Sequence, residues 1–147
     1  MKIPTDALIL VADGEKALFL RNKGDEEYPN FEVERKKTQD NPPAREYATD
    51  RPGRMTDTGA QQKSAMDDTD WHALEKERFA TDLADMLFRR AENNEFDNLI
   101  ICAAPQTLGE LRKQLHKTVE DRTVGEIDKD LTNIPIHEIE KHLVETD

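Results

Sequence analysis

The sequence predicts a three-layer α/β fold built on a mixed five-stranded sheet. Apolar residues are few, but they occur in short clusters of strand length that are bounded by turn-forming residues. After residue 70, apolar residues recur at helical spacing, and a continuous apolar run follows that stretch. Strands in the first part of the chain and alternating helices and strands in the second part favour one α/β domain over residues 1–147.

The first forty residues predict a β-meander. Residues 7–12 form an apolar run that ends at Asp13-Gly14, a dipeptide typical of hairpins, and residues 16–20 supply a second strand. Residues 31–35 alternate apolar and charged side chains, as a half-exposed strand does. We therefore expect three strands that pair in sequence order.

A long polar loop, residues 40–70, separates the meander from the main helix. It contains three prolines and two glycines, so we expect no regular element there. From Asp70 onward, helical spacing predicts the longest helix, which ends near Asn93-Asn94. The apolar residues with this spacing are Leu74, Phe79, Leu83, Met86 and Leu87. The acidic residues that favour its N-terminus are Asp67, Asp68 and Asp70.

A continuous apolar run at residues 98–104 predicts a strand that is buried on both faces, and we expect it to be the central strand of the sheet. Thr107 and Glu110 have the spacing of a capping box at the start of the next helix. The second half of the chain therefore begins with a strand–helix unit.

The last elements predicted are a charged edge strand over residues 124–131 and a C-terminal helix. Thr132 or Asn133 is expected to cap this helix, with Pro135 in its first turn. The order is then β-β-β-α-β-α-β-α, which is the minimal plan of a ribonuclease H-like fold with right-handed crossovers.

The charge balance limits the classes of partner. The chain has 32 acidic against 21 basic residues and a net charge of -11, which argues against a nucleic-acid or membrane surface that spans the whole molecule. The first apolar run is too short for a signal sequence or membrane span, and the single cysteine, Cys102, excludes an intrachain disulfide. We expect a cytoplasmic protein that does not enter the membrane.

Nucleophilic catalysis has little support in the sequence. The one serine, Ser64, lacks a Gly-x-Ser-x-Gly turn, and Cys102 lies in an apolar strand where an inert core thiol is expected. Neither of the glycine-rich motifs that bind nucleotide phosphates occurs. We expect no cofactor.

Metal binding is also weakly supported. The histidines form no metal-binding motif, and we expect them to be solvated or to cap helices; they are His72, His116, His137 and His142. On a ribonuclease H-like sheet, Asp6, Asp13 and either Asp57 or Asp70 would be the alternative, as two-metal ligands of a nuclease. Asp6 and Asp13 bracket the first strand, however, so turn and edge roles explain them without a metal.

The polar loop is locally basic. Between Arg35 and Met66 there are seven basic and four acidic residues, which leaves +3 there and -14 on the rest of the chain. A cationic segment on an acidic body suits contact with a phosphate backbone, or docking to an acidic partner. A solvated linker is the plainer alternative, although about thirty residues without regular structure are uncommon inside a compact domain.

Four sequence blocks, in order, resemble the bacterial host attachment protein family, whose members are described as required for attachment to host cells. The blocks are Gly53-Arg54 with Asp57-Thr-Gly59, Trp71-His72 with residues 75–80, residues 99–112 (LIICAAPQTLGELR) and residues 129–132 (KDLT). The resemblance spans about residues 5–145 and is therefore a resemblance of nearly the whole chain.

That family in turn resembles, more remotely, the central domain of archaeal and eukaryotic peptide-chain release factors. In those proteins a Gly-Gly-Gln loop enters the ribosomal peptidyl-transferase centre, and Gly59-Ala60-Gln61 occupies the comparable place here. Ala60 replaces the second glycine and restricts the backbone. We expect neither a codon-reading nor a recycling domain in these 147 residues. If the resemblance extends to mechanism, Gln61 positions a water against a peptidyl-tRNA ester without a protein nucleophile.

The resemblance implies a binding module that acts through residues 40–70 on RNA, on the ribosome or tRNA, or on a protein partner, with an indirect role in attachment. Release-factor-like hydrolysis that uses Gln61 is the alternative. Three of the candidate binding residues are basic and are expected to contact phosphates. The full candidate set is Arg51, Arg54, Asp57, Gly59, Lys63 and His72.

Overall fold

The computed structural model describes residues 1–38 and 65–146, and in residues 65–73 it describes the backbone alone. The elements, in chain order, are β1 (Leu8–Ala12), β2 (Lys16–Asn22), β3 (Phe31–Thr38), α3 (Ala65–Glu92), β4 (Leu99–Ala103), α4 (Pro105–Gln114), α5 (Lys117–Glu120), β5 (Thr123–Ile127) and α6 (Ile136–Glu145). This order confirms the predicted alternation of elements, with α5 as an unpredicted four-residue addition.

The strands form one mixed five-stranded sheet, as predicted, and their order is β3-β2-β1-β4-β5. The β1–β2 and β2–β3 pairs are antiparallel, whereas β1–β4 and β4–β5 are parallel. The prediction that β4 is central was wrong, because β1 holds that position. Both strands are buried at every residue, since helices cover both faces of the sheet here, so an apolar run alone does not distinguish them.

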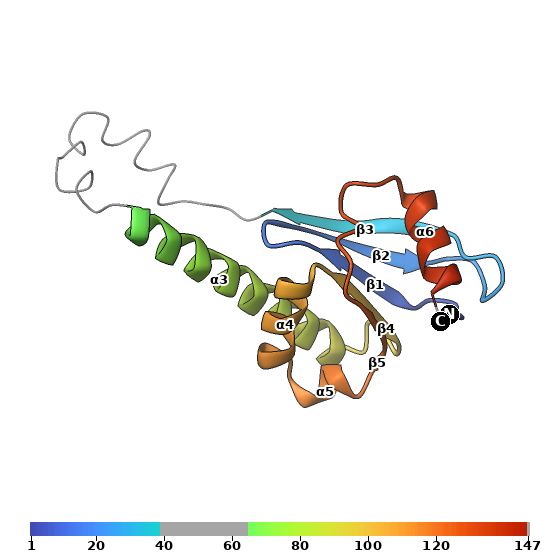
Figure 1. Cartoon of the computed structure of the whole chain (residues 1–147). Coiled ribbons are helices and arrows are strands. Elements are labelled where there is room, and N and C mark those ends of the chain that lie inside the picture. The colour runs from blue at the N-terminus through green and yellow to red at the C-terminus, as the bar shows by residue number, and fades with distance from the viewer. Residues whose placement is uncertain (39–64, 147) are drawn as a thin grey trace.

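Two hydrophobic clusters, one on each face, make the three layers. Alternate strand residues point to opposite faces, so Leu8 and Leu10 pack with α3, α4 and α5, while Ile9 and Val11 pack with α6. Figure 1 shows the first three helices on one side of the sheet and α6 on the other. The predicted three-layer α/β fold is therefore confirmed.

The long helix α3 begins at Ala65, five residues earlier than the predicted start at Asp70. Helical apolar spacing marks only the part of a helix that packs on a core, and the first described apolar side chain, Leu74, is 52% exposed. Among the apolar side chains of α3, burial begins at Phe79. Asp67 and Asp68 lie in or next to the first turn, where negative charge is favourable.

The end of α3 agrees with the prediction. Asn94 has a left-handed backbone (φ 55°), and its N–H bonds to the carbonyl of Ala91 at 3.0 Å. The N–H of Glu95 bonds to the carbonyl of Arg90 at 2.9 Å. These two bonds form a Schellman motif, in which asparagine tolerates the left-handed position better than most residues.

Both predicted side-chain caps in the second half were wrong. Helix α4 begins at Pro105 with Ala104 as N-cap, because proline is preorganised for the first helical position, and Thr107 falls inside the first turn. Helix α6 has Pro135 as its N-cap residue, and the strand before it, β5, ends at Ile127 instead of residue 131. The side chains of Thr132 and Asn133 bond elsewhere, as described below.

A fully buried asparagine, Asn22, joins the N-terminal residues to the β2–β3 connection. Its Nδ2 donates to the carbonyls of Ile3 and Pro4, both at 3.1 Å, and its Oδ1 accepts from the N–H groups of Gly24 and Asn30 at 2.9 and 3.0 Å. These bonds satisfy the buried amide of Asn22 and tie the N-terminal residues to the turn after β2.

We expect Asn22→Ala to lower the free energy of unfolding by about 2–4 kcal/mol, because it leaves buried donors and acceptors without partners. Urea denaturation measures the change, and Asn93→Ala, at an exposed asparagine, is the matched control with a change within about 0.5 kcal/mol. Equal stability of the Asn22 variant and the control would contradict this role.

Candidate functional site

The carboxyl ends of four strands lie at one edge of the sheet. Strands β1, β4 and β5 are parallel, and β3 shares their direction because it is antiparallel to β2. Open α/β sheets bind ligands preferentially at this edge. The chain leaves β3 there at Thr38 and re-enters the described structure at the first residue of α3, Ala65. The prediction that residues 40–70 lack regular structure was wrong for residues 65–70, which belong to α3, and the rest of the predicted loop lies outside the described residues.

Helix α3 approaches the β1–β2 hairpin at this edge through Lys76, and its first turns extend beyond the sheet (Figure 1). The aliphatic stem of Lys76 lies over Gly14, where a Cβ atom would be 3.2 Å from the lysine Cγ. Gly14 does not have a positive φ, so close approach of α3, rather than a left-handed turn, explains the glycine.

At the same edge, a cluster of polar side chains joins the β1–β2 turn to the connection between β5 and α6. The Oδ1 of Asp13 accepts from the N–H groups of Glu15 and Lys16 at 2.7 Å, and its Oδ2 lies 3.1 Å from the hydroxyl of Thr132. The same hydroxyl lies 2.5 Å from Oδ1 of Asp130, and Lys16 Nζ donates to Oδ1 of Asn133 at 2.5 Å. These contacts tie the β5–α6 connection to the hairpin and give the 129–132 block a structural role.

The alternative two-metal site is not formed. Asp6 and Asp13 lie at opposite ends of β1, a strand roughly 16 Å long at about 3.3 Å per residue, whereas paired metal ions lie about 4 Å apart. Asp57 and the side chain of Asp70 lie outside the described residues. Within the described part of the chain, no group of three His, Cys, Asp or Glu residues is arranged to hold a metal ion.

A groove between β3 and the last turns of α3 collects positive charge, and we call it the arginine groove. It has a volume of about 740 Å³. Its lining residues are Arg21, Glu34, Arg35, Met86, Arg89, Arg90 and Glu95. Four arginines against two glutamates give this surface a net positive charge on a chain whose total is -11.

An ion network forms the floor of the arginine groove. Glu34 lies 3.0 Å from Nε of Arg21 and 2.6 Å from Nη2 of Arg90, and Nε of Arg90 lies 3.1 Å from Glu95. Burial raises the pKa of the Glu34 carboxyl, but hydrogen bonds and charge from Arg21 and Arg90 outweigh that effect and lower the pKa below its ordinary value. The network joins β2, β3 and α3.

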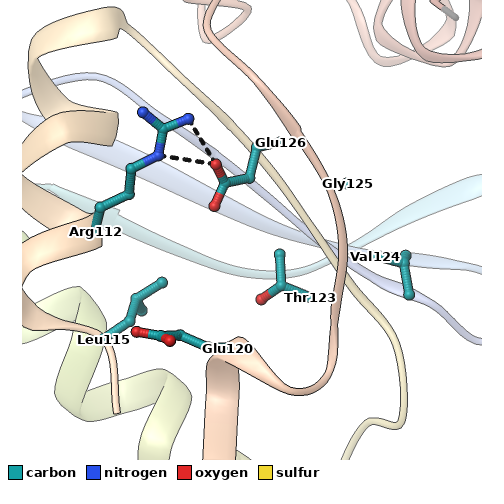
Figure 2. A pocket seen from close by; sticks show the side chains of 7 residues that line it. All are labelled: Arg112, Leu115, Glu120, Thr123, Val124, Gly125 and Glu126. Carbon is teal, nitrogen blue, oxygen red and sulfur yellow. Dashed lines mark hydrogen bonds and ion pairs between the residues drawn. The ribbon is translucent and has the colours of Figure 1, made fainter. Parts of the chain in front are cut away.

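A second groove, of about 530 Å³, lies between α4 and the edge strand β5. Figure 2 shows Arg112 and Glu126 facing each other across it, with both Nε and Nη2 of the arginine bonded to one glutamate oxygen at 2.9 and 2.7 Å. Glu120 also lines this groove, so its charge is negative overall. It is therefore a poorer surface for an anionic ligand than the arginine groove.

Most of the sequence-predicted site lies outside the described residues. This holds for Arg51, Arg54, Asp57, Gly59, Gln61 and Lys63. His72 lies in α3, with its side chain outside the described part. These residues stay predictions, and the structure adds only that their segment is bounded by β3 and α3.

Two predictions about other reactive side chains are confirmed. Cys102 is fully buried, and burial raises its pKa to about 12, so its thiol is inert. His116 caps α5, because its Nδ1 accepts from the N–H of Thr118 at 3.1 Å, and its ring packs on Phe88 with centroids 4.2 Å apart.

Sequence reasoning missed the arginine groove. Its residues come from β2, β3, α3 and the turn after α3, so no local motif joins them. The available signal was the pair Arg89-Arg90 in the last turn of α3 and the basic run that begins at Arg35.

Comparison with known proteins gives the family. The chain matches the sequence profile of bacterial archaeo-eukaryotic release factor family 12 over residues 6–143. The chain belongs to this family. Among curated proteins, none matches. The match confirms the resemblance to release factors, and it does not address host attachment.

Family membership makes this a release-factor-like, translation-related domain. Over residues 1–38 and 65–146, the structure contains no helix that is both long enough and apolar enough to cross a bilayer.

The ion network predicts a pH dependence. Because the folded-state pKa of Glu34 is below its ordinary value of 4.5, the network stabilises the fold above about pH 4.5 and this stabilisation is lost as the pH falls through the folded-state pKa. We expect Glu34→Gln to destabilise the protein at pH 7, and the difference in unfolding free energy from wild type to shrink below pH 4.5. Urea denaturation from pH 7 to pH 3 measures it; a difference that stays constant or grows on acidification would contradict the network.

Proposed function

We propose that this release-factor-like domain binds RNA on the ribosome through residues 40–70. The observation that carries the proposal is a basic stretch, residues 35–66, that begins on the last residues of β3 at the carboxyl edge of the sheet and ends at the start of α3, on an otherwise acidic chain. Residues 39–64 alone have four basic and four acidic residues, so the excess charge comes from Arg35, Lys36 and Lys37 of β3. The segment and its border residues carry +3, and the remainder carries -14. An acidic chain that approaches a phosphate backbone needs its cations concentrated on the contact surface.

The described border of the segment supports this proposal. Lys36 and Lys37 come directly before the segment on the edge strand β3, and Lys36 is exposed. Lys37 lies 4.0 Å from Asp82 of α3, with both side chains partly exposed, which makes a weak surface pair. The excess positive charge of residues 35–66 therefore lies on the end of β3, next to the four cations of the segment.

The proposal predicts that the chain co-sediments with purified ribosomes. The triple variant Arg51→Ala, Arg54→Ala and Lys63→Ala is expected to bind roughly a hundredfold more weakly at 0.1 M salt, because three phosphate contacts are lost. The matched control removes three exposed lysines from α4, α5 and α6, namely Lys113, Lys117 and Lys141.

Two results would contradict the proposal. One is equal sedimentation of the segment variant and the control, which would remove the segment from the contact. The other is capture of one protein partner with no RNA, which would favour the alternative that residues 40–70 bind a protein partner. Whether the partner is RNA or a protein, we propose that any role in attachment is indirect.

A second candidate function is hydrolysis of the peptidyl-tRNA ester. It is favoured by Gly59-Ala60-Gln61, which lies in the same segment of a release-factor-family chain. In this reaction the Gln61 amide orients a water that attacks the ester carbonyl, the tRNA ribose hydroxyl leaves, and the peptide leaves as a carboxylic acid. No protein nucleophile is needed, in keeping with the inert thiol of Cys102.

Peptide release from stalled ribosomes tests this second function. Gln61→Ala is expected to slow release by about 10²–10³-fold, the usual cost of losing one polar group that stabilises a transition state. Gln62→Ala, at the neighbouring glutamine, is the matched control with unchanged release. Identical rates for wild type and Gln61→Ala would remove hydrolysis and leave binding.

A further inference from the structure

Two of the four arginines in the arginine groove form ion pairs, and the other two do not. The paired arginines are Arg21 and Arg90: both bond to Glu34, and Arg90 also bonds to Glu95. Arg35 and Arg89 are exposed, and neither forms an ion pair with another residue in the part of the chain that the structure describes. Arg35 comes from β3 and Arg89 from α3, so the free cations stand on opposite walls of the groove.

The floor of the groove is held in place by its own contacts. Nη1 of Arg21 donates to the carbonyl of Asp6 at 2.9 Å, and the guanidinium of Arg90 lies 5.6 Å from the centre of the Phe19 ring. The side chains of Arg21 and Arg90 are 9% and 16% exposed. The charges of Glu34 and Glu95 are therefore balanced by Arg21 and Arg90, and they do not repel an anion that approaches Arg35 and Arg89.

We infer that the arginine groove is a second contact surface for an RNA phosphate backbone. The inference rests on the proposed function, and it extends the contact from the segment at the carboxyl edge onto the folded body. The two elements that border the segment, β3 and α3, are the same two that form the walls of the groove. Arg35 lies three residues before the end of β3, so an RNA strand that leaves the segment meets this wall first. Arg89 lies 24 residues after Ala65, about 36 Å along α3, so the strand has to run the length of the helix to contact both walls.

The chemistry of the groove suits phosphate. Guanidinium groups present a planar fork of donors that matches phosphate oxygens, and two of them on facing walls hold consecutive phosphates. Met86 also lines the groove and offers an apolar contact to a ribose. By contrast, the α4–β5 groove uses its arginine internally and also carries Glu120.

Fluorescence anisotropy with a fluorescein-labelled RNA stem-loop tests the inference. The groove variant is Arg35→Ala with Arg89→Ala, and the segment variant is Arg51→Ala with Arg54→Ala and Lys63→Ala. The matched control is Lys2→Ala with Lys141→Ala, which makes the same change in net charge at exposed lysines in the N-terminal segment and on α6. Thermal melting checks that every variant is folded.

The groove variant is expected to bind roughly twentyfold more weakly at 0.1 M salt, and the slope of log affinity against log salt is expected to fall by about 1–2. The control is expected to stay within about twofold of wild type.

Three outcomes would overturn the inference. If the groove variant binds like wild type while the segment variant is weakened, the groove is not a contact and the proposed function stands. If the control loses as much affinity as the groove variant, the effect is one of net charge alone. If wild type itself does not bind the RNA, the proposed function fails and the inference with it.

Discussion

Parallel pairing of β1 with β4 is the constraint on which the rest of the structure depends. The register runs from Leu8 opposite Leu99 to Ala12 opposite Ala103, so strands about ninety residues apart in sequence lie side by side. A parallel pair needs a crossover connection, and here that connection contains β2, β3, the basic segment and α3.

Several features of the candidate site follow from that pairing. Both strands are buried at every position, so each face of the sheet has to be covered, by α3, α4 and α5 on one side and by α6 on the other. The crossover leaves the sheet at the carboxyl end of β3 and returns through α3, which places the segment at the edge where α/β sheets bind ligands. The walls of the arginine groove are the same two elements.

Patterns of short range predicted most of the fold. Asp13-Gly14 marked the hairpin, the apolar runs marked β1 and β4, and Asn93-Asn94 marked the end of α3, because each feature depends on neighbouring residues. The failures concern long-range context. The central position of β1 depends on which strands pair, and the hydroxyl of Thr132 bonds to Asp13, a residue far away in sequence, instead of capping α6.

The candidate site divides in the same way. The basic stretch of residues 35–66 and the Gly59-Ala60-Gln61 motif within it are visible in the sequence, and the roles of Arg51, Arg54, Gln61 and Lys63 stay predictions. The arginine groove was not predictable, because Arg21, Glu34 and Arg90 meet only after β2, β3 and α3 have packed. Glu34 lies on the edge strand β3, where apolar and charged residues alternate. This alternation does not distinguish a glutamate in an ion network from a solvated one.

The central claim is that RNA contacts this protein along β3, α3 and the segment that joins them. Titration of the ¹⁵N-labelled protein with an RNA stem-loop, followed by amide chemical shifts, tests it most directly. The account predicts that the largest shifts occur at residues of β3 and the last turns of α3, including Arg35 and Arg89, and that α6 and the α4–β5 groove remain unchanged. Shifts concentrated on α6 or on the α4–β5 groove would contradict it.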